Sequence, residues 1–150
     1  MVPLVVLMVS AFTARGIGLL GAGFFGSWSA ALAAGLAAMF FLTAFSHWAR
    51  PRRDGLIAIV PPWIPAPRQI VTVTGILEAA GALGVLVPAT RFAAASCLAV
   101  LLILMFPANV RAARGVDHPA APSTPLPLRT MLQVVFVSAA GFVAYTSAGL

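Results

Sequence analysis

The chain has 150 residues, of which 61% are hydrophobic and only 8% charged, and its formal net charge is +6. A composition this apolar excludes a soluble globular domain, because too little polar surface would remain to face water, so lipid must surround most of the chain. The nine arginines are spread between apolar runs and form no basic face interleaved with aromatic side chains, which argues against a nucleic-acid-binding protein.

Five apolar stretches are each close to the length of about 20 residues that a helix needs to cross a hydrocarbon core about 30 Å thick. We therefore predict an all-α fold, a polytopic bundle of five transmembrane helices. Arg15 interrupts the first stretch, and if that stretch did not span, the chain would cross the membrane four times. The predicted spans are Val2 to Gly23, Ser29 to Trp48, Ile70 to Pro88, Phe92 to Val110 and Thr130 to Gly149.

The arginines are distributed unevenly between the connections. The two long connections, Ala49 to Gln69 and Arg111 to Arg129, hold seven of them, and the other side has only Arg91 and Arg15. By the positive-inside rule the long connections face the cytoplasm, which places the N-terminus inside and the C-terminus outside. The opening residues have no arginine or lysine ahead of the apolar stretch, so they lack the pattern of a secretory signal peptide.

A proline-rich segment lies within the first long connection. The short apolar run Leu56 to Val60 is followed by the sequence PPWIPAP, and its prolines preclude a continuing helix while Trp63 is typical of the headgroup layer. We predict an interfacial hairpin, and the alternative is a lid over a site between the helices.

Small residues recur at four-residue spacing in the spans, for example Gly75 with Ala79, which favours close helix packing.

Glu78 is the polar residue that lipid should most strongly exclude. It lies near the middle of the third span, where an ionised carboxylate costs at least about 2.5 kcal/mol. Arg15 is the one basic residue also well inside an apolar stretch, so we predict that the two pair. The pair would either tether two helices without any chemistry or supply a carboxylate that carries a proton or contacts a ligand.

Four further polar residues fall near the cytoplasmic ends of their spans: His47, Asn109, Arg129 and Gln133. We predict that they line one mouth, in which His47 exchanges protons with water while Asn109 and Arg129 hold a polar headgroup. Three of them also have a purely structural interpretation: His47 as an interfacial histidine, Asn109 as a helix cap behind Pro107, and Arg129 as a topology-setting arginine.

The single cysteine, Cys97, excludes an internal disulfide or CxxC pair, and no phosphate loop, HExxH or paired metal-ligand spacing occurs.

The order of several motifs carries a family resemblance. His47 is followed by RRD at residues 52–54, VPPWIPAP at 60–67, TGILEAAGALGVLVP at 74–88, Arg91, MFPANV at 105–110 and PLRTMLQ at 127–133. This arrangement resembles the DoxX and DoxX-like family of membrane proteins from about Ser29 onward. The resemblance implies a four-helix membrane domain over residues 29–150, preceded by an extra transmembrane segment within residues 1–28. The chain departs from the family pattern in that extra segment and in Trp48, which replaces a phenylalanine.

The DoxX family takes its name from a subunit of a thiosulfate:quinone oxidoreductase, and other members are associated with oxidative-stress complexes. The resemblance therefore implies an accessory, non-catalytic subunit in a bacterial cytoplasmic membrane, which binds a quinone-like or lipid molecule in support of a membrane redox partner. No flavin, haem or metal is implied. The alternative is a small proton-coupled transporter or lipid-handling protein that uses the same buried carboxylate.

Overall fold

In the computed structural model, which describes residues 1–149, the chain forms six α-helices and one short 3-10 helix and contains no strand in that range. The elements are α1 (Val2–Leu19), η1 (Gly23–Phe25), α2 (Trp28–Ser46), α3 (Arg52–Ile59), α4 (Pro67–Leu86), α5 (Arg91–Ala113) and α6 (Leu126–Ser147). All except α3 and η1 are long and apolar enough to cross a membrane. The predicted all-α bundle with five candidate spans is therefore confirmed.

Two of the long helices begin about one turn earlier than hydropathy predicts. α4 begins at Pro67 instead of Ile70, and α6 begins at Leu126 instead of Thr130. Both added turns contain a proline near the first helical position, where its missing N–H group is tolerated and its fixed φ suits a helix. They also contain Arg68 and Arg129, which an apolar window leaves out.

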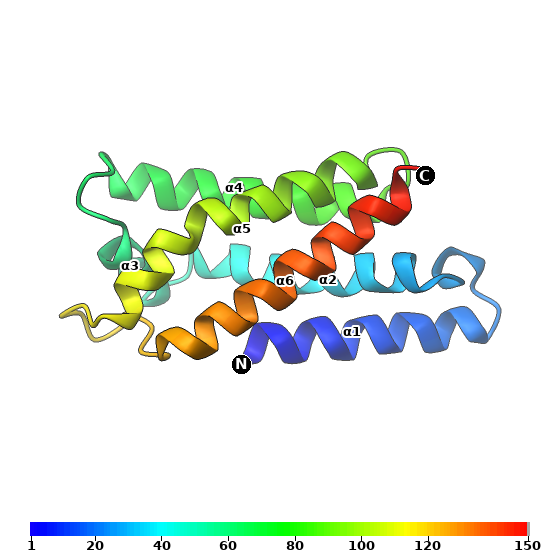
Figure 1. Ribbon diagram of the computed structural model, residues 1–150, viewed down its shortest axis with the longest axis horizontal. Helices are drawn as coiled ribbons and strands as arrows, with labels where there is room; N and C mark the ends of the chain where they lie inside the picture. The colour runs from blue at the N-terminus through cyan, green and yellow to red at the C-terminus, as the bar shows by residue number, and fades with distance from the viewer. Residues whose placement is uncertain (150) are drawn as a thin grey trace.

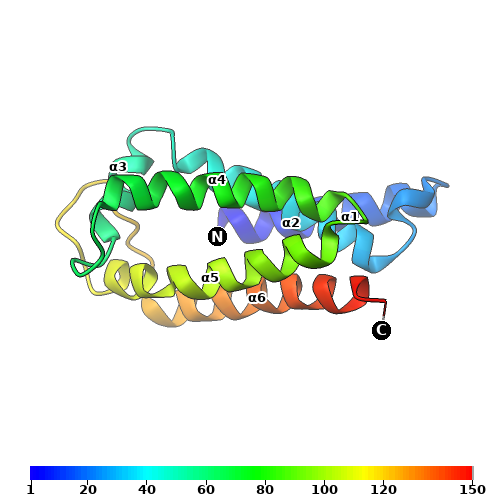
Figure 2. The same ribbon diagram turned by 90° about the horizontal axis from the view of Figure 1, so that it is seen from above.

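The helices enclose α2, which packs against α1, α4 and α6, while α5 packs against α4 and α6 (Figures 1 and 2). The core consists of interlocked apolar side chains from these helices, among them Leu36, Phe40, Val85, Leu98 and Val143. Outward-facing positions are also apolar, and Leu104 of α5 is 70% exposed. An apolar core combined with an apolar exterior is the pattern of a bundle whose surroundings are lipid.

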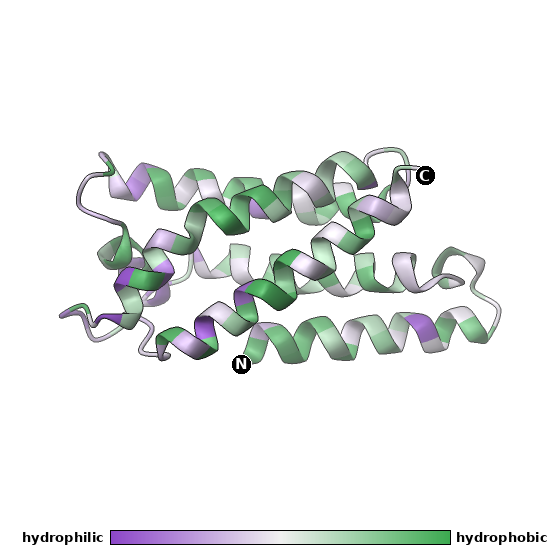
Figure 3. Cartoon of the chain, in the orientation of Figure 1, coloured by the Kyte–Doolittle hydropathy of each residue, from purple (hydrophilic) through white to green (hydrophobic). Residues whose placement is uncertain are grey.

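The two ends of the bundle differ in polarity. One end, here called the α3 end, holds α3, the ends of α2 and α5 and the beginnings of α4 and α6 (Figure 1). Hydrophilic residues gather there, whereas the middle of the bundle is predominantly hydrophobic (Figure 3). The opposite end holds η1 and the turn between α4 and α5. Polar chemistry is therefore concentrated at the α3 end.

The proline-rich segment differs from the predicted hairpin. Its first part is the helix α3, and this helix packs against α4 and α5 with Ile59 buried. Gly55 brings α3 against the connection that leads to α6, because a Cβ atom at Gly55 would overlap the carbonyl of Ala120. The segment is therefore built into the end of the bundle, while Trp63 remains 74% exposed.

Candidate functional site

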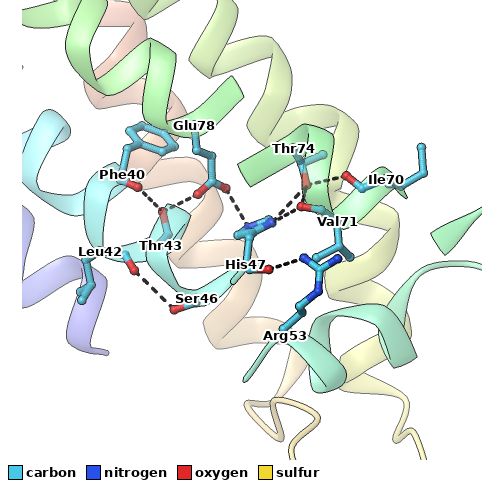
Figure 4. A network of polar contacts seen from close by, with 10 residues as sticks. All are labelled: Phe40, Leu42, Thr43, Ser46, His47, Arg53, Ile70, Val71, Thr74 and Glu78. Carbon is cyan, nitrogen blue, oxygen red and sulfur yellow. Dashed lines mark hydrogen bonds and ion pairs between the residues drawn. The ribbon is translucent and has the colours of Figure 1, made fainter. Parts of the chain in front are cut away.

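A buried acid and a buried base face each other near the α3 end. The carboxylate oxygen Oε1 of Glu78 lies 3.5 Å from Nε2 of His47, and the Thr43 hydroxyl donates a hydrogen bond of 2.7 Å to Oε2 (Figure 4). His47 and Glu78 are each only 3% exposed. Thr43 and His47 are four residues apart, so α2 presents both of them on one face toward α4.

Two polar groups of α4 orient the imidazole of His47. His47 is the C-cap of α2, and its Nδ1 lies 2.7 Å from the carbonyl oxygen of Val71 and 3.3 Å from the Thr74 hydroxyl, both on α4. The close approach depends on Gly75, where a Cβ atom would lie 2.6 Å from the Cβ of His47. The Nε2 atom is thereby directed toward Glu78.

The contacts constrain the protons of the pair. A carbonyl oxygen accepts hydrogen bonds and cannot donate them, so Nδ1 of His47 carries a proton toward Val71. A second proton, on Nε2, makes the two groups an ion pair of imidazolium and carboxylate at 3.5 Å, and its transfer to Glu78 would leave both groups neutral. The two forms differ by one proton transfer, and we refer to His47 and Glu78 as the proton-sharing pair.

The predicted pairing of Arg15 with Glu78 is wrong. The guanidinium of Arg15 lies over the ring of Trp28, 5.6 Å from its centroid, and its Nε atom has no hydrogen-bond partner among residues 1–149. Trp28 begins α2, whereas Thr43, which contacts Glu78, lies 15 residues later, or about 22 Å along the axis at 1.5 Å per residue. No arginine side chain spans that separation.

Arg53 supports the pair from α3. Its guanidinium donates to the carbonyl oxygen of His47 and, at 2.9 Å, to the Thr72 hydroxyl on α4. Arg53 therefore ties α3 to both helices that hold the proton-sharing pair. Arg53 and Thr43 were not predicted as site residues, although Thr43 could have been, because it lies four residues before His47 and so shares its helix face.

A cavity of about 490 Å³ extends from this pair. His47, Thr43 and Glu78 line one part of it, and apolar side chains from α2, α5 and α6, including Phe40, Leu102 and Phe136, line its walls. The other polar residues that line the cavity include the predicted Asn109, Arg129 and Gln133. The structure thus brings together five of the six predicted residues, and Arg15 is not among them.

Arg129 and its neighbours form a second polar cluster. The guanidinium of Arg129 donates to Oδ1 of Asn109 at 3.1 Å and to the carbonyl oxygens of Thr124 at 2.7 Å and Pro122 at 2.9 Å. Gln133 donates to the carbonyl oxygen of Leu102 at 2.6 Å. Arg129 therefore anchors the α5–α6 connection as well as lining the cavity.

A smaller apolar cavity lies on the other side of His47. It has a volume of about 280 Å³ and is lined by residues of α3, α4 and α5, including Ile59, Val71 and Leu101. His47, Leu56 and Met105 line both cavities. The imidazole therefore borders both the 490 Å³ cavity, which holds the polar clusters, and the smaller apolar cavity.

A comparison with protein-family models matches residues 36–144, and the matching family is described as a domain of unknown function (DUF8561). The match begins within α2 and includes every residue of the proton-sharing pair and of the Arg129 cluster. α1 lies outside the matched range. No curated protein and no solved structure matches the chain.

Proposed function

This chain belongs to the DUF8561 family, whose description assigns no activity, and we propose from the site geometry that it binds a small amphipathic molecule, quinone-like or lipid, in the 490 Å³ cavity. The observation that carries the proposal is that one cavity joins two polar clusters across apolar walls. Ligand sites in proteins are mostly apolar concavities with a few convergent polar groups, and this cavity has that composition.

The donors around the cavity suit a ligand whose head carries oxygen acceptors. A guanidinium has five N–H groups, and three of those of Arg129 are engaged by Asn109, Thr124 and Pro122. The other two have no partner among residues 1–149. The proton-sharing pair can donate from the opposite cluster. A quinone-like ring presents acceptors at opposite edges and a flat apolar face, which matches this arrangement, and the neighbouring apolar cavity would accommodate a tail.

An accessory role follows from the resemblance to DoxX and DoxX-like proteins. In this role the protein holds a quinone-like or lipid molecule for a redox partner in a bacterial cytoplasmic membrane and does not itself catalyse a reaction. The orientation that we propose places the α3 end in the cytoplasm, because seven of the nine arginines lie at that end.

A proton-coupled transporter is the second candidate, and the proton-sharing pair is the observation that favours it. A transporter also needs access from the opposite end of the bundle. Beyond Glu78, however, the space between the helices is filled by Ala82, Val85 and Leu98, each no more than 1% exposed. Transport would therefore require a second arrangement of the helices, whereas binding requires only the observed one.

Thermal unfolding in detergent tests the binding proposal with decylubiquinone, a quinone with a short alkyl tail. The test variant is Leu132→Trp, because Leu132 lines the cavity and a tryptophan would fill it. The matched control is Val134→Trp on the same helix, because Val134 is 59% exposed and faces outward. We expect decylubiquinone to raise the unfolding temperature of the wild type and the control but not that of Leu132→Trp.

Stabilisation should grow with the logarithm of ligand concentration and reach about 2.7 kcal/mol when the free ligand is at a hundred times its Kd. Equal stabilisation of Leu132→Trp and the wild type would show that the quinone binds elsewhere. No stabilisation of the wild type by decylubiquinone, combined with stabilisation by a phospholipid that Leu132→Trp abolishes, would replace the quinone-like ligand with a lipid.

A further inference from the structure

A second site lies outside the proposed ligand cavity, on the outer face of the bundle at the α3 end. Residues from two segments enclose a cavity of about 510 Å³: Pro62 and Trp63 from the proline-rich segment, and Pro107, Arg111 and Arg114 from α5 and its C-cap. We propose that this cavity binds the phosphate headgroup of an anionic phospholipid. The site is independent of the proposed function.

The two arginines lack acidic partners. Within residues 1–149, neither Arg111 nor Arg114 takes part in an ion pair, and the Nε atom of Arg111 is buried without a hydrogen-bond partner. A buried donor without a partner is costly, and a rotation of the Arg111 side chain that turns this N–H toward a phosphate oxygen in the cavity would satisfy it. The forked guanidinium also matches two oxygens of a phosphate at once, which a point charge cannot do.

The surface of α5 next to the arginines suits acyl chains. Val100, Ile103 and Leu104 are each more than half exposed, and they precede Pro107, Arg111 and Arg114 at spacings of three or four residues. Residues at these spacings share one face of a helix. This face therefore runs from apolar side chains in the lipid layer to two cations at its end, in the order of a phospholipid's chains and headgroup.

The third feature of the site is the side chain of Trp63. Its indole ring is 74% exposed and borders the same cavity as the arginines. Tryptophan side chains are enriched at the headgroup level of membranes, and basic pockets on the cytoplasmic side of helix bundles bind acidic headgroups. A lipid is therefore a better occupant than free phosphate, because free phosphate would leave the adjoining apolar face of α5 uncovered.

Native mass spectrometry tests the site by counting lipids bound to the folded protein. The probes are dioleoylphosphatidylglycerol, dioleoylphosphatidylcholine and inorganic phosphate. The test variants are Arg111→Gln with Arg114→Gln, and Arg114→Gln alone, which alters an exposed side chain that makes no hydrogen bond within residues 1–149. The control is Arg50→Gln with Arg68→Gln, which removes the same charge from two exposed arginines at the same end.

We expect saturable binding of phosphatidylglycerol to the wild type, weakened at least about tenfold in the double variant and severalfold in Arg114→Gln, with the control within about threefold of the wild type. Equal weakening in the control would show that only net charge matters and would overturn the proposal. Equal binding of phosphatidylcholine, which carries the same phosphate but no net charge, would show that the site does not select an anionic lipid and would overturn the proposal. Displacement of the lipid by inorganic phosphate at millimolar concentration would identify a site for free phosphate instead.

Discussion

Glu78 shows how a single carboxylate is accommodated within an apolar bundle. Its two oxygens contact two side chains of α2, the Thr43 hydroxyl and the His47 imidazole. Removing one partner of a buried pair typically costs about 3 to 5 kcal/mol, because it leaves the other group uncompensated.

Two double-mutant cycles distinguish the observed partner of Glu78 from the predicted one. In the cycle of His47→Leu with Glu78→Leu, the double variant should recover part of the stability that each single variant loses, with a coupling of about 0.5 to 3 kcal/mol. In the cycle of Arg15→Leu with Glu78→Leu, the losses should add within about 0.5 kcal/mol. Equilibrium unfolding in detergent gives the free energies, and coupling in the Arg15 cycle alone would contradict the observed pairing.

Sequence alone identified polar residues within the long apolar helices but not their partners. Arg15 and Glu78 were matched because both lie well inside apolar stretches, and an apolar pattern carries no information about rotation around a helix or about the register between neighbouring helices. In the structure, the carbonyl of Leu7 on α1 lies beside Gly35 of α2, and this register carries Arg15 toward Trp28 at the opposite end. The hydrogen bonds of Arg129 to the carbonyl oxygens of Thr124 and Pro122 were likewise not predicted, because they depend on how the loop folds back onto α6.

At the scale of elements, the site depends on a close contact between α2 and α4. Gly75 makes this contact possible, because a Cβ atom there would meet the Cβ of His47 at 2.6 Å and its Cγ at 2.9 Å. Neither atom lies at the far end of a flexible side chain, so the helices themselves would have to separate. Small residues in the spans were predicted to allow close packing, and at Gly75 the packing also positions an imidazole.

We expect Gly75→Ala to lower the free energy of unfolding by about 1 to 3 kcal/mol through overpacking. The matched control is Gly141→Ala in α6, where a Cβ atom would meet nothing within 4 Å. This change should be neutral or stabilise the protein by about 0.5 to 1 kcal/mol, because alanine favours a helix more than glycine does. The same detergent unfolding assay measures both, and equal effects would show that α2 and α4 are less tightly packed than described.

Hydropathy predicted the five long helices well because each is predominantly apolar over about 20 residues. It missed the helical state of α3, which has only eight residues and begins with Arg52, Arg53 and Asp54. Such a helix is marginal in isolation and is stabilised by tertiary contacts, here the burial of Gly55 and Ile59. The alternative of a lid fits this placement, because Arg52 and Leu56 line the larger cavity.

At the scale of the whole molecule, the asymmetric arginines predict the orientation in the membrane. A reporter fused after Leu150 should be outside the cytoplasm, and one inserted in the connection between α5 and α6 should be inside it. Alkaline phosphatase is active only outside and green fluorescent protein only inside, so the two reporters give opposite signals at each position. A fluorescent C-terminal fusion would mean that α1 does not cross or that the orientation is reversed.

The grouping of five predicted polar residues around one cavity also emerges only at this scale. Four of them, His47, Asn109, Arg129 and Gln133, were predicted at the ends of their spans, which indicated a common mouth, and the antiparallel connections bring those ends together. The cavity itself depends on how α2, α5 and α6 pack against one another at the α3 end, which no local sequence pattern encodes. The polar composition of the site was therefore predictable, whereas its volume and the depth at which Glu78 joins it were not.

Native mass spectrometry of protein extracted in a mild detergent tests the central claim that the larger cavity holds a small molecule. We expect a bound species of defined mass, quinone-like or lipid, on the wild type and on Val134→Trp but not on Leu132→Trp. Wild-type protein that carries no such species, or a species retained equally by Leu132→Trp, would contradict it.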